Sequence, residues 1–219
     1  MRWWLSSPAM LVAGRIETTI TKEEVEVFVM NDLLVGKLVR LAAYDPEEMG
    51  KAFSRWTRDS EYWRLMDTSP AHMPSAQGAT KFFEKEIDKL DASLYFFGVR
   101  RLEDNALIGE MILHVVNWAG GDAFVGLTIG ERENWGKGYG TEMMRLLLQY
   151  AFLEVNLHRV TLNVFEYNPR AIRSYEKAGF RHEGRMRKFL NKEGKRWDML
   201  FMGVLREEWM GLDTAAVVE

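Results

Sequence analysis

The chain has 219 residues, of which 47% are hydrophobic, and this length and apolar content predict one compact domain of enzyme size. Its formal net charge of -3 at pH 7 differs from the basic excess of proteins that coat nucleic acid, so the sequence carries no strong nucleic-acid signal. It contains no cysteine, which excludes disulfides, thiolate metal sites and a cysteine nucleophile, and its four histidines lack zinc-ligand spacing, so we expect no metal.

Residues 1–34 are expected to form an N-terminal extension of uncertain role. The apolar stretch 9–13 follows Pro8 and is soon followed by Glu17, which disfavours a signal peptide. Met30 is a sensible alternative start, which would make the first 29 residues an accessory segment. No segment reaches the roughly 20 apolar residues that a membrane span needs. We therefore expect a cytoplasmic protein without membrane contact.

The rest of the chain alternates between the periodicities of strands and helices. The expected strands cover residues 35–41, 95–101, 106–116, 124–129 and 160–165, and the terminal segment 187–205 reads as a hairpin that turns at 191–194. The expected helices cover residues 45–56, 60–66, 75–90, 141–154 and 168–179, with Asp45, Ser75 and Asn168 as N-caps and Gly179 as the last helix's stop. The three strand-like runs between residues 95 and 129 predict an antiparallel meander.

A glycine-rich turn, Trp135-Gly136-Lys137-Gly138-Tyr139-Gly140, separates the strand 124–129 from the helix that follows. Such a turn is an anion site, because the first amides of the helix have no partner within the helix and the helix dipole favours negative charge. The dinucleotide fingerprint G-x-G-x-x-G lacks its third glycine here. The Walker pattern G-x-x-x-x-G-K-[ST] is also not met, because Gly130 lies one residue too far from Gly136-Lys137. Both nucleotide interpretations are therefore disfavoured.

At this turn the chain resembles the GNAT family of N-acetyltransferases, which binds the pyrophosphate of acetyl-CoA on a [QR]-x-x-G-x-[GA] turn. Trp135 stands where the family has Gln or Arg, and this departure resembles the branch of ribosomal-protein N-terminal and spermidine acetyltransferases. A second matching block runs from Asn168 to Phe180. The resemblance spans residues 35–209 and leaves 210–219 as a C-terminal tail. It implies a mixed α/β fold whose twisted, mostly antiparallel sheet is splayed at the CoA cleft and flanked by helices.

The resemblance implies acetyl-CoA as co-substrate, with its pyrophosphate on the amides of 136–141 and its pantetheine between the strands 124–129 and 160–165. A backbone amide near Leu127 or Thr128 would polarise the thioester carbonyl. Tyr175 would protonate the departing thiolate, although a packed aromatic is the alternative for it, as a plain helix cap is for Asn168. The residues expected to bind the cofactor are Leu127, Thr128, Ile129, Trp135, Gly136, Lys137, Gly138, Tyr139, Gly140, Thr141, Asn163, Asn168, Arg170 and Tyr175.

The general base is less clear from the sequence. Direct attack requires a neutral amine, so a carboxylate or an imidazole must accept a proton. Many members of the family carry Glu where this chain has Phe124. Glu110 and His114 lie four residues apart on one predicted strand, and therefore on one face, so they are the candidate bases; a purely structural role is the alternative for each.

The residues expected to bind the acceptor amine lie in the segment 56–67. Its aromatic and acidic residues form either a mouth for a cationic amine or a set of packed aromatics with solvated acids. These residues are Trp56, Asp59, Glu61, Tyr62, Trp63 and Asp67.

We therefore expect acetyl transfer from acetyl-CoA to a primary amine by direct attack in a ternary complex, because no cysteine can carry the acetyl group. The acceptor would be a protein N-terminus or a small amine such as a polyamine or an antibiotic. The alternative is a non-catalytic domain that binds or senses acyl-CoA. Relatives in the family often dimerise, so a homodimer is also expected.

Overall fold

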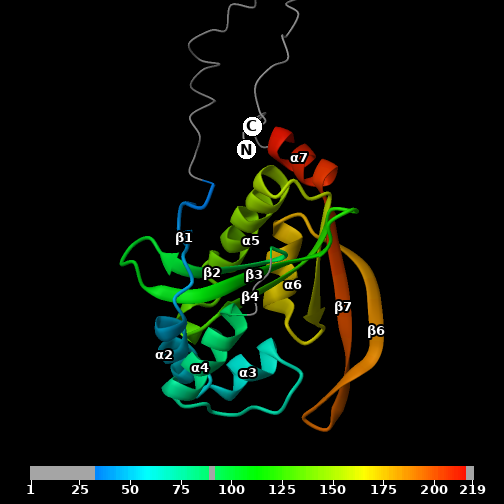
Figure 1. The fold of residues 1–219 in the computed structure, drawn as a ribbon. Coiled ribbons are helices and arrows are strands. Elements are labelled where there is room, and N and C mark those ends of the chain that lie inside the picture. Colours follow the sequence, from blue (N-terminus) through cyan, green and yellow to red (C-terminus); the bar gives the residue numbers. More distant parts are fainter. Residues whose placement is uncertain (1–32, 89–91, 216–219) are drawn as a thin grey trace, which may run out of the picture. The chain divides into compact units, whose positions relative to one another are not determined.

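The computed structural model describes residues 33–88 and 92–215, with side chains to residue 211 (Figure 1). The expected N-terminal extension therefore lies almost wholly outside the described residues, and its proposed role stays a prediction. At the other end, helix α7 (Arg206–Ala215) runs past residue 209 into the segment expected to be a tail.

Seven strands form one open sheet in the order β1-β2-β3-β4-β5-β7-β6. They are β1 (Val39–Ala42), β2 (Leu94–Arg101), β3 (Leu107–Asn117), β4 (Asp122–Ile129), β5 (Arg159–Phe165), β6 (Arg181–Lys192) and β7 (Lys195–Leu205). Every neighbouring pair is antiparallel except β4 and β5, which are parallel. The expected meander is β2-β3-β4, and the mostly antiparallel mixed α/β fold is confirmed.

The sheet splits between its two parallel strands. Strands β4 and β5 pair only over Asp122–Phe124 and Arg159–Thr161, although β4 continues to Ile129 and β5 to Phe165. Strand β5 keeps its other partner, β7, along its whole length. The later residues of β4 therefore diverge from β5, and this divergence is the expected splay.

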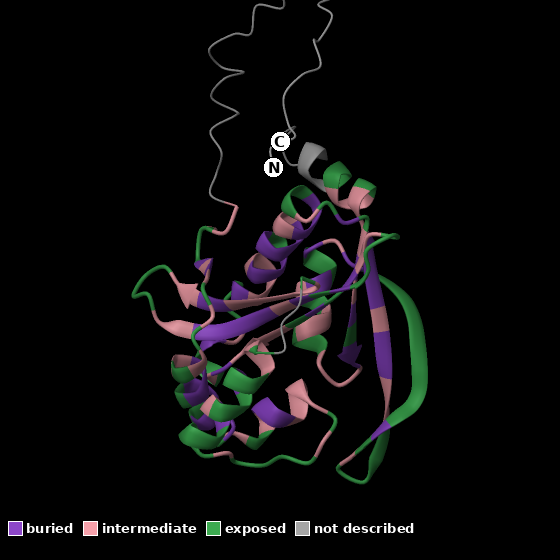
Figure 2. Cartoon of the chain, in the orientation of Figure 1, coloured by how far each residue is buried: buried purple, intermediate pink, exposed green. Residues whose placement is uncertain are grey.

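Helices cover both faces of the sheet (Figure 1). They are α2 (Pro46–Trp56), α3 (Ser60–Met66), α4 (Ala76–Ile87), the 3-10 turn η1 (Arg132–Asn134), α5 (Tyr139–Gln149), its π-helical continuation η2 (Tyr150–Glu154) and α6 (Pro169–Lys177). Helices α2, α3 and α4 lie on the side opposite to α5, and they enclose an apolar cluster of their own around Phe53 and Trp63. The largest cluster, around Met111, Leu113 and Met143, fills the space between the sheet and α5 (Figure 2).

Two strands differ from the sequence expectation, each for a physical reason. Strand β1 starts at Val39 rather than at residue 35, because residues 34–36 fold back on it: the amide of Gly36 donates to the carbonyl of Val39 and that of Leu41 to the carbonyl of Leu34, each at 2.8 Å. In this turn the amides of Lys37, Leu38 and Val39 donate to the Glu142 carboxylate at 2.8, 2.6 and 2.8 Å. Strand β6 starts at residue 181 rather than 187. Its residues 181–189 are all exposed, so they lack the apolar alternation that marks a half-buried strand (Figure 2).

Candidate active site between β4 and β5

A cleft of about 640 Å³ opens where β4 and β5 diverge. Its lining residues come from helices α3 and α6, strands β3, β4 and β5, and the turn 135–140 with the start of α5. Most of the residues expected at the cofactor line this cleft. They are Leu127, Thr128, Ile129, Trp135, Gly136, Gly138, Gly140, Thr141, Asn163, Asn168, Arg170 and Tyr175.

The glycine-rich turn has the backbone of an anion cradle. Gly136 and Gly138 have φ angles of 77° and 90°, which side chains rarely adopt. Gly138 is the N-cap of α5 and no side chain caps this helix end. The amide of Thr141 donates to the carbonyl of Gly138 at 3.1 Å. This backbone geometry suits an anionic group; the binding of the acetyl-CoA pyrophosphate here stays a prediction.

Two residues of the turn point elsewhere. Lys137 is exposed and is not among the residues that line the cleft. Tyr139 is only 8% exposed and packs in the main core. Their side chains are therefore not placed to hold a ligand in the cleft, and a contact with acetyl-CoA through their backbone amides stays a prediction.

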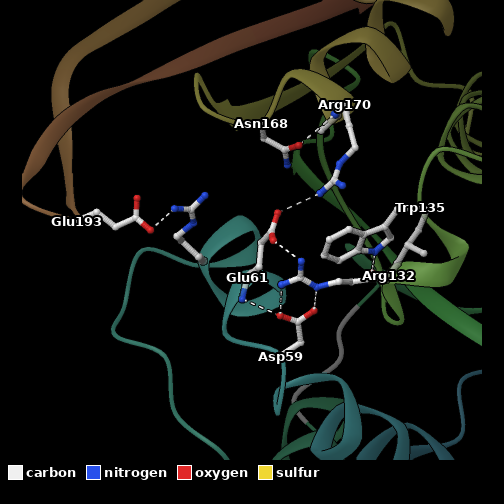
Figure 3. Close-up of polar contacts among 10 residues, drawn as sticks. Asp59, Glu61, Arg132, Trp135, Asn168, Arg170 and Glu193 are labelled. Carbon is white, nitrogen blue, oxygen red and sulfur yellow. Dashed lines mark hydrogen bonds and ion pairs between the residues drawn. The ribbon is translucent and has the colours of Figure 1, made fainter.

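Trp135 links the turn to both walls of the cleft (Figure 3). Its indole N–H donates to the carbonyl of Ile129 at 2.9 Å, at the end of β4. The guanidinium of Arg170 lies 4.2 Å from the centre of its ring, and that of Arg132 lies at 5.5 Å. Glu61 on α3 contacts both arginines, Arg132 at 2.6 Å and Arg170 at 3.6 Å. The residue that replaces the family's Gln or Arg therefore connects α3, β4 and α6.

Helix α6 contributes a basic face that we did not predict in full. Asn168 caps the helix by accepting from the amide of Ala171 at 3.2 Å, which accounts for this asparagine even without a ligand. Arg170, Arg173 and Lys177 line the cleft, and they are spaced i, i+3 and i+7. That spacing places three cations on one helix face, so it was a usable signal for phosphate groups.

Tyr175 lies in the cleft wall with 8% of its surface exposed. Burial raises the pKa of its hydroxyl to about 12. The phenol therefore keeps its proton at neutral pH and can donate it, or a hydrogen bond, to a thiolate formed beside it. The geometry is compatible with the acid role, which stays a prediction.

The structure separates the two candidate bases. His114 is exposed and lines the cleft, opposite Phe124 in the β3–β4 register. Glu110 lies on the same face of β3 but is only 8% exposed, and the hydroxyl of Tyr44 donates to it at 2.8 Å. Burial raises the pKa of Glu110, which favours its uncharged form. Glu110 is not among the residues that line the cleft.

The expected acidic mouth is largely neutralised. Asp59 caps α3 and also accepts from Arg132 at 2.7 Å, so both of its roles are structural. Glu61 is held by two arginines, as described above. Trp56 and Trp63 are 2% and 5% exposed within the cluster formed by α2, α3 and α4. The structure therefore favours packed aromatics and paired acids over a mouth for a cation.

In the part of the chain that the structure describes, no helix is long and apolar enough to cross a membrane. The same residues contain no cluster of three His, Asp or Glu side chains that could hold a metal ion. The cytoplasmic location, the absence of a metal and the homodimer stay predictions.

Comparison with known proteins agrees with this geometry. Residues 39–181 match the family model described as "Acetyltransferase (GNAT) domain". The chain is 30% identical over 175 residues to the SPbeta prophage-derived uncharacterized N-acetyltransferase YokL of Bacillus subtilis (strain 168), which covers 80% of this chain and 93% of that protein. It is 34% identical over 110 residues to the putative ribosomal N-acetyltransferase YdaF of the same organism, over 50% of this chain and 60% of that protein.

Among solved structures, the fold is similar to that of spermidine N-acetyltransferase from Vibrio cholerae in complex with CoA and spermine. The TM-score is 0.66 at 24% sequence identity, and the match covers 78% of this chain and 98% of that one. The family model spans well over half of the chain, and the splayed sheet and the glycine-rich turn lie within it. The chain therefore belongs to the GNAT family and is an acetyl-CoA-dependent N-acetyltransferase.

Proposed function

We propose that the chain transfers the acetyl group of acetyl-CoA to a primary amine by direct attack in a ternary complex. The observation that carries this proposal is the cleft itself, which has an anion cradle at one end and a protonated tyrosine in its wall. In the reaction the amine nitrogen bonds to the thioester carbon, the carbon–sulfur bond breaks, and the proton lost by the amine is balanced by the one gained by the thiolate. No acyl-enzyme is needed.

Different groups of the chain bind the phosphates, polarise the thioester carbonyl and transfer protons. The cradle at Gly136 and Gly138 and the basic face of α6 bind phosphate groups. The diverging part of β4, which includes Leu127, offers backbone amides to the thioester carbonyl as it gains negative charge. Tyr175 donates to the leaving sulfur, and His114 is the cleft-lining side chain that can accept a proton from the amine.

A CoA-release assay against a panel of amines and N-terminal peptides tests the proposal. We expect turnover with at least one primary amine, and initial-rate lines that intersect when both substrates are varied, as a ternary complex requires. Acetyl-CoA binding measured by calorimetry in parallel serves as the control. Tight acetyl-CoA binding without turnover on any amine would contradict the proposal and would favour the alternative, a domain that binds or senses acyl-CoA.

A further inference from the structure

Apolar residues outside the glycine-rich turn line part of the cleft. Leu65 and Met66 of α3, Ile112 of β3, Phe124 of β4 and Phe165 of β5 all line it. They belong to four elements that are separated in the sequence, so the apolar wall is a product of the fold. A wall of this kind favours a ligand whose body is apolar.

The charges in the same cleft are cationic. Among the described residues that line it, no Asp or Glu is present, whereas Arg170, Arg173 and Lys177 are. The nearby acids do not correct this imbalance, because Glu61 is paired with two arginines and Glu110 is buried beneath Tyr44. The three cations are the ones proposed to bind the phosphates of acetyl-CoA, so a second ammonium group on an acceptor would find no carboxylate among the described lining residues to pair with.

An apolar wall also affects the reacting amine. Removing an amine from water disfavours its charged form, so the neutral form that attack requires is favoured beside such a wall. This effect lowers the demand on a dedicated base. It fits a cleft in which the one candidate carboxylate, Glu110, is not a lining residue.

Phe124 holds a special position in this wall. It is the last residue of β4 that pairs with β5, so it lies at the fork where the cleft begins, and 36% of its surface is exposed. It faces His114 across the β3–β4 register, and Thr128 lies on the same face of β4. A side chain at this position can contact an acceptor on its way to the diverging strands.

We propose that the acceptor is a primary amine on an apolar or aromatic body with no second positive charge, and that Phe124 is a residue that sets this specificity. This inference rests on the proposed amine acetylation and narrows it. An arylalkylamine and a peptide whose first residue is apolar share this chemistry. A polyamine lacks it, so the acceptor named for the similar Vibrio cholerae structure does not extend to this chain.

The test compares kcat/KM for three acceptors by CoA release: phenethylamine, a neutral peptide that begins with Phe, and spermidine. For the wild-type chain, phenethylamine or the peptide should exceed spermidine by about 100-fold or more, because an unpaired second charge is costly to desolvate. The two apolar substrates distinguish a small-molecule acceptor from a peptide acceptor. Equal or better turnover of spermidine would overturn the inference and leave amine acetylation intact.

A charge placed at Phe124 gives a second, independent test. Phe124→Glu should raise the ratio of kcat/KM for spermidine to kcat/KM for phenethylamine by about 10-fold; the ratio is compared because a carboxylate at this position can also act as a general base on every acceptor. Val116→Glu is the matched control, because Val116 is 50% exposed on the same hairpin and does not line the cleft. Phe124→Leu keeps the wall apolar and should keep the wild-type preference. If Phe124→Glu is folded by circular dichroism and its preference is unchanged, Phe124 does not set specificity.

Discussion

Replacing Tyr175 with Phe removes one hydroxyl from the cleft and leaves the ring in place. The ring is 8% exposed and lies 6.1 Å, centre to centre, from that of Phe180, so Tyr175→Phe keeps the packing. A positioned general acid contributes about 10²- to 10⁴-fold to a rate, which corresponds to roughly 2.7–5.4 kcal/mol. Burial raises the pKa of Tyr175 to about 12, well above the roughly 8.5 of a thiol. Proton transfer from the tyrosine hydroxyl to the thiolate is therefore uphill. We expect Tyr175→Phe to lower kcat by about 100-fold, which is the lower end of the range for a general acid.

Steady-state kinetics measure this change. The KM for acetyl-CoA should stay within about twofold, because the hydroxyl acts on the leaving group and not on the phosphates. The ratio of wild-type to variant kcat should be constant between pH 7 and 10, since Tyr175 keeps its proton below about pH 12. Tyr150→Phe is the control, because Tyr150 packs against Tyr95 and Phe97 and does not line the cleft. Wild-type turnover in Tyr175→Phe would refute the acid role.

Three further variants test the turn and the buried carboxyl. Gly138→Ala should cost about 1–2 kcal/mol of stability, because φ is 90° there, and it should weaken acetyl-CoA binding in calorimetry; unchanged affinity would count against the cradle. Burial raises the pKa of Glu110, so its contribution to stability is present below the ordinary carboxyl pKa and is lost as the pH rises. Glu110→Gln should therefore be more stable than wild type in urea at pH 8, with the difference shrinking towards pH 4; a less stable variant at pH 8 contradicts this reasoning. Trp135→Phe loses the indole bond to Ile129, worth about 0.5–1.5 kcal/mol, but keeps a ring under Arg170. It should melt slightly lower with little change in KM for acetyl-CoA, whereas a large rise in KM would give the indole N–H a direct role.

Much of the backbone could be predicted because its signals are local. Asp45, Ser75 and Asn168 cap the helices for which they were expected, and Gly179, with a φ of 104°, ends α6. A cap depends on a side chain and an amide two or three residues apart, so no distant contact is needed to interpret it. The glycine spacing at the turn is equally local, and it disfavoured both nucleotide interpretations; acetyl-CoA was what the resemblance to the GNAT family implied.

The sequence did not determine which charged side chains are exposed and which are buried or paired. Glu110 and His114 share a face of β3, as their spacing predicted, yet one is buried and the other lines the cleft. The carboxylate of Glu110 accepts a hydrogen bond from the hydroxyl of Tyr44, which lies 66 residues earlier in the chain. Likewise, Glu61 was interpreted as a free acid until the fold placed Arg132 and Arg170 beside it.

The amino-acid sequence by itself thus determined the order of most helices and strands, their caps and the glycine-rich turn, because each depends on neighbouring residues. Only the tertiary structure decided which charges are paired, which carboxyl is buried and which side chains line the cleft. The turn before β1 shows the reason: the amide of Lys37 donates to the carboxylate of Glu142, which lies 105 positions further along the chain. Pairing, burial and access depend on such distant contacts, which no local pattern contains.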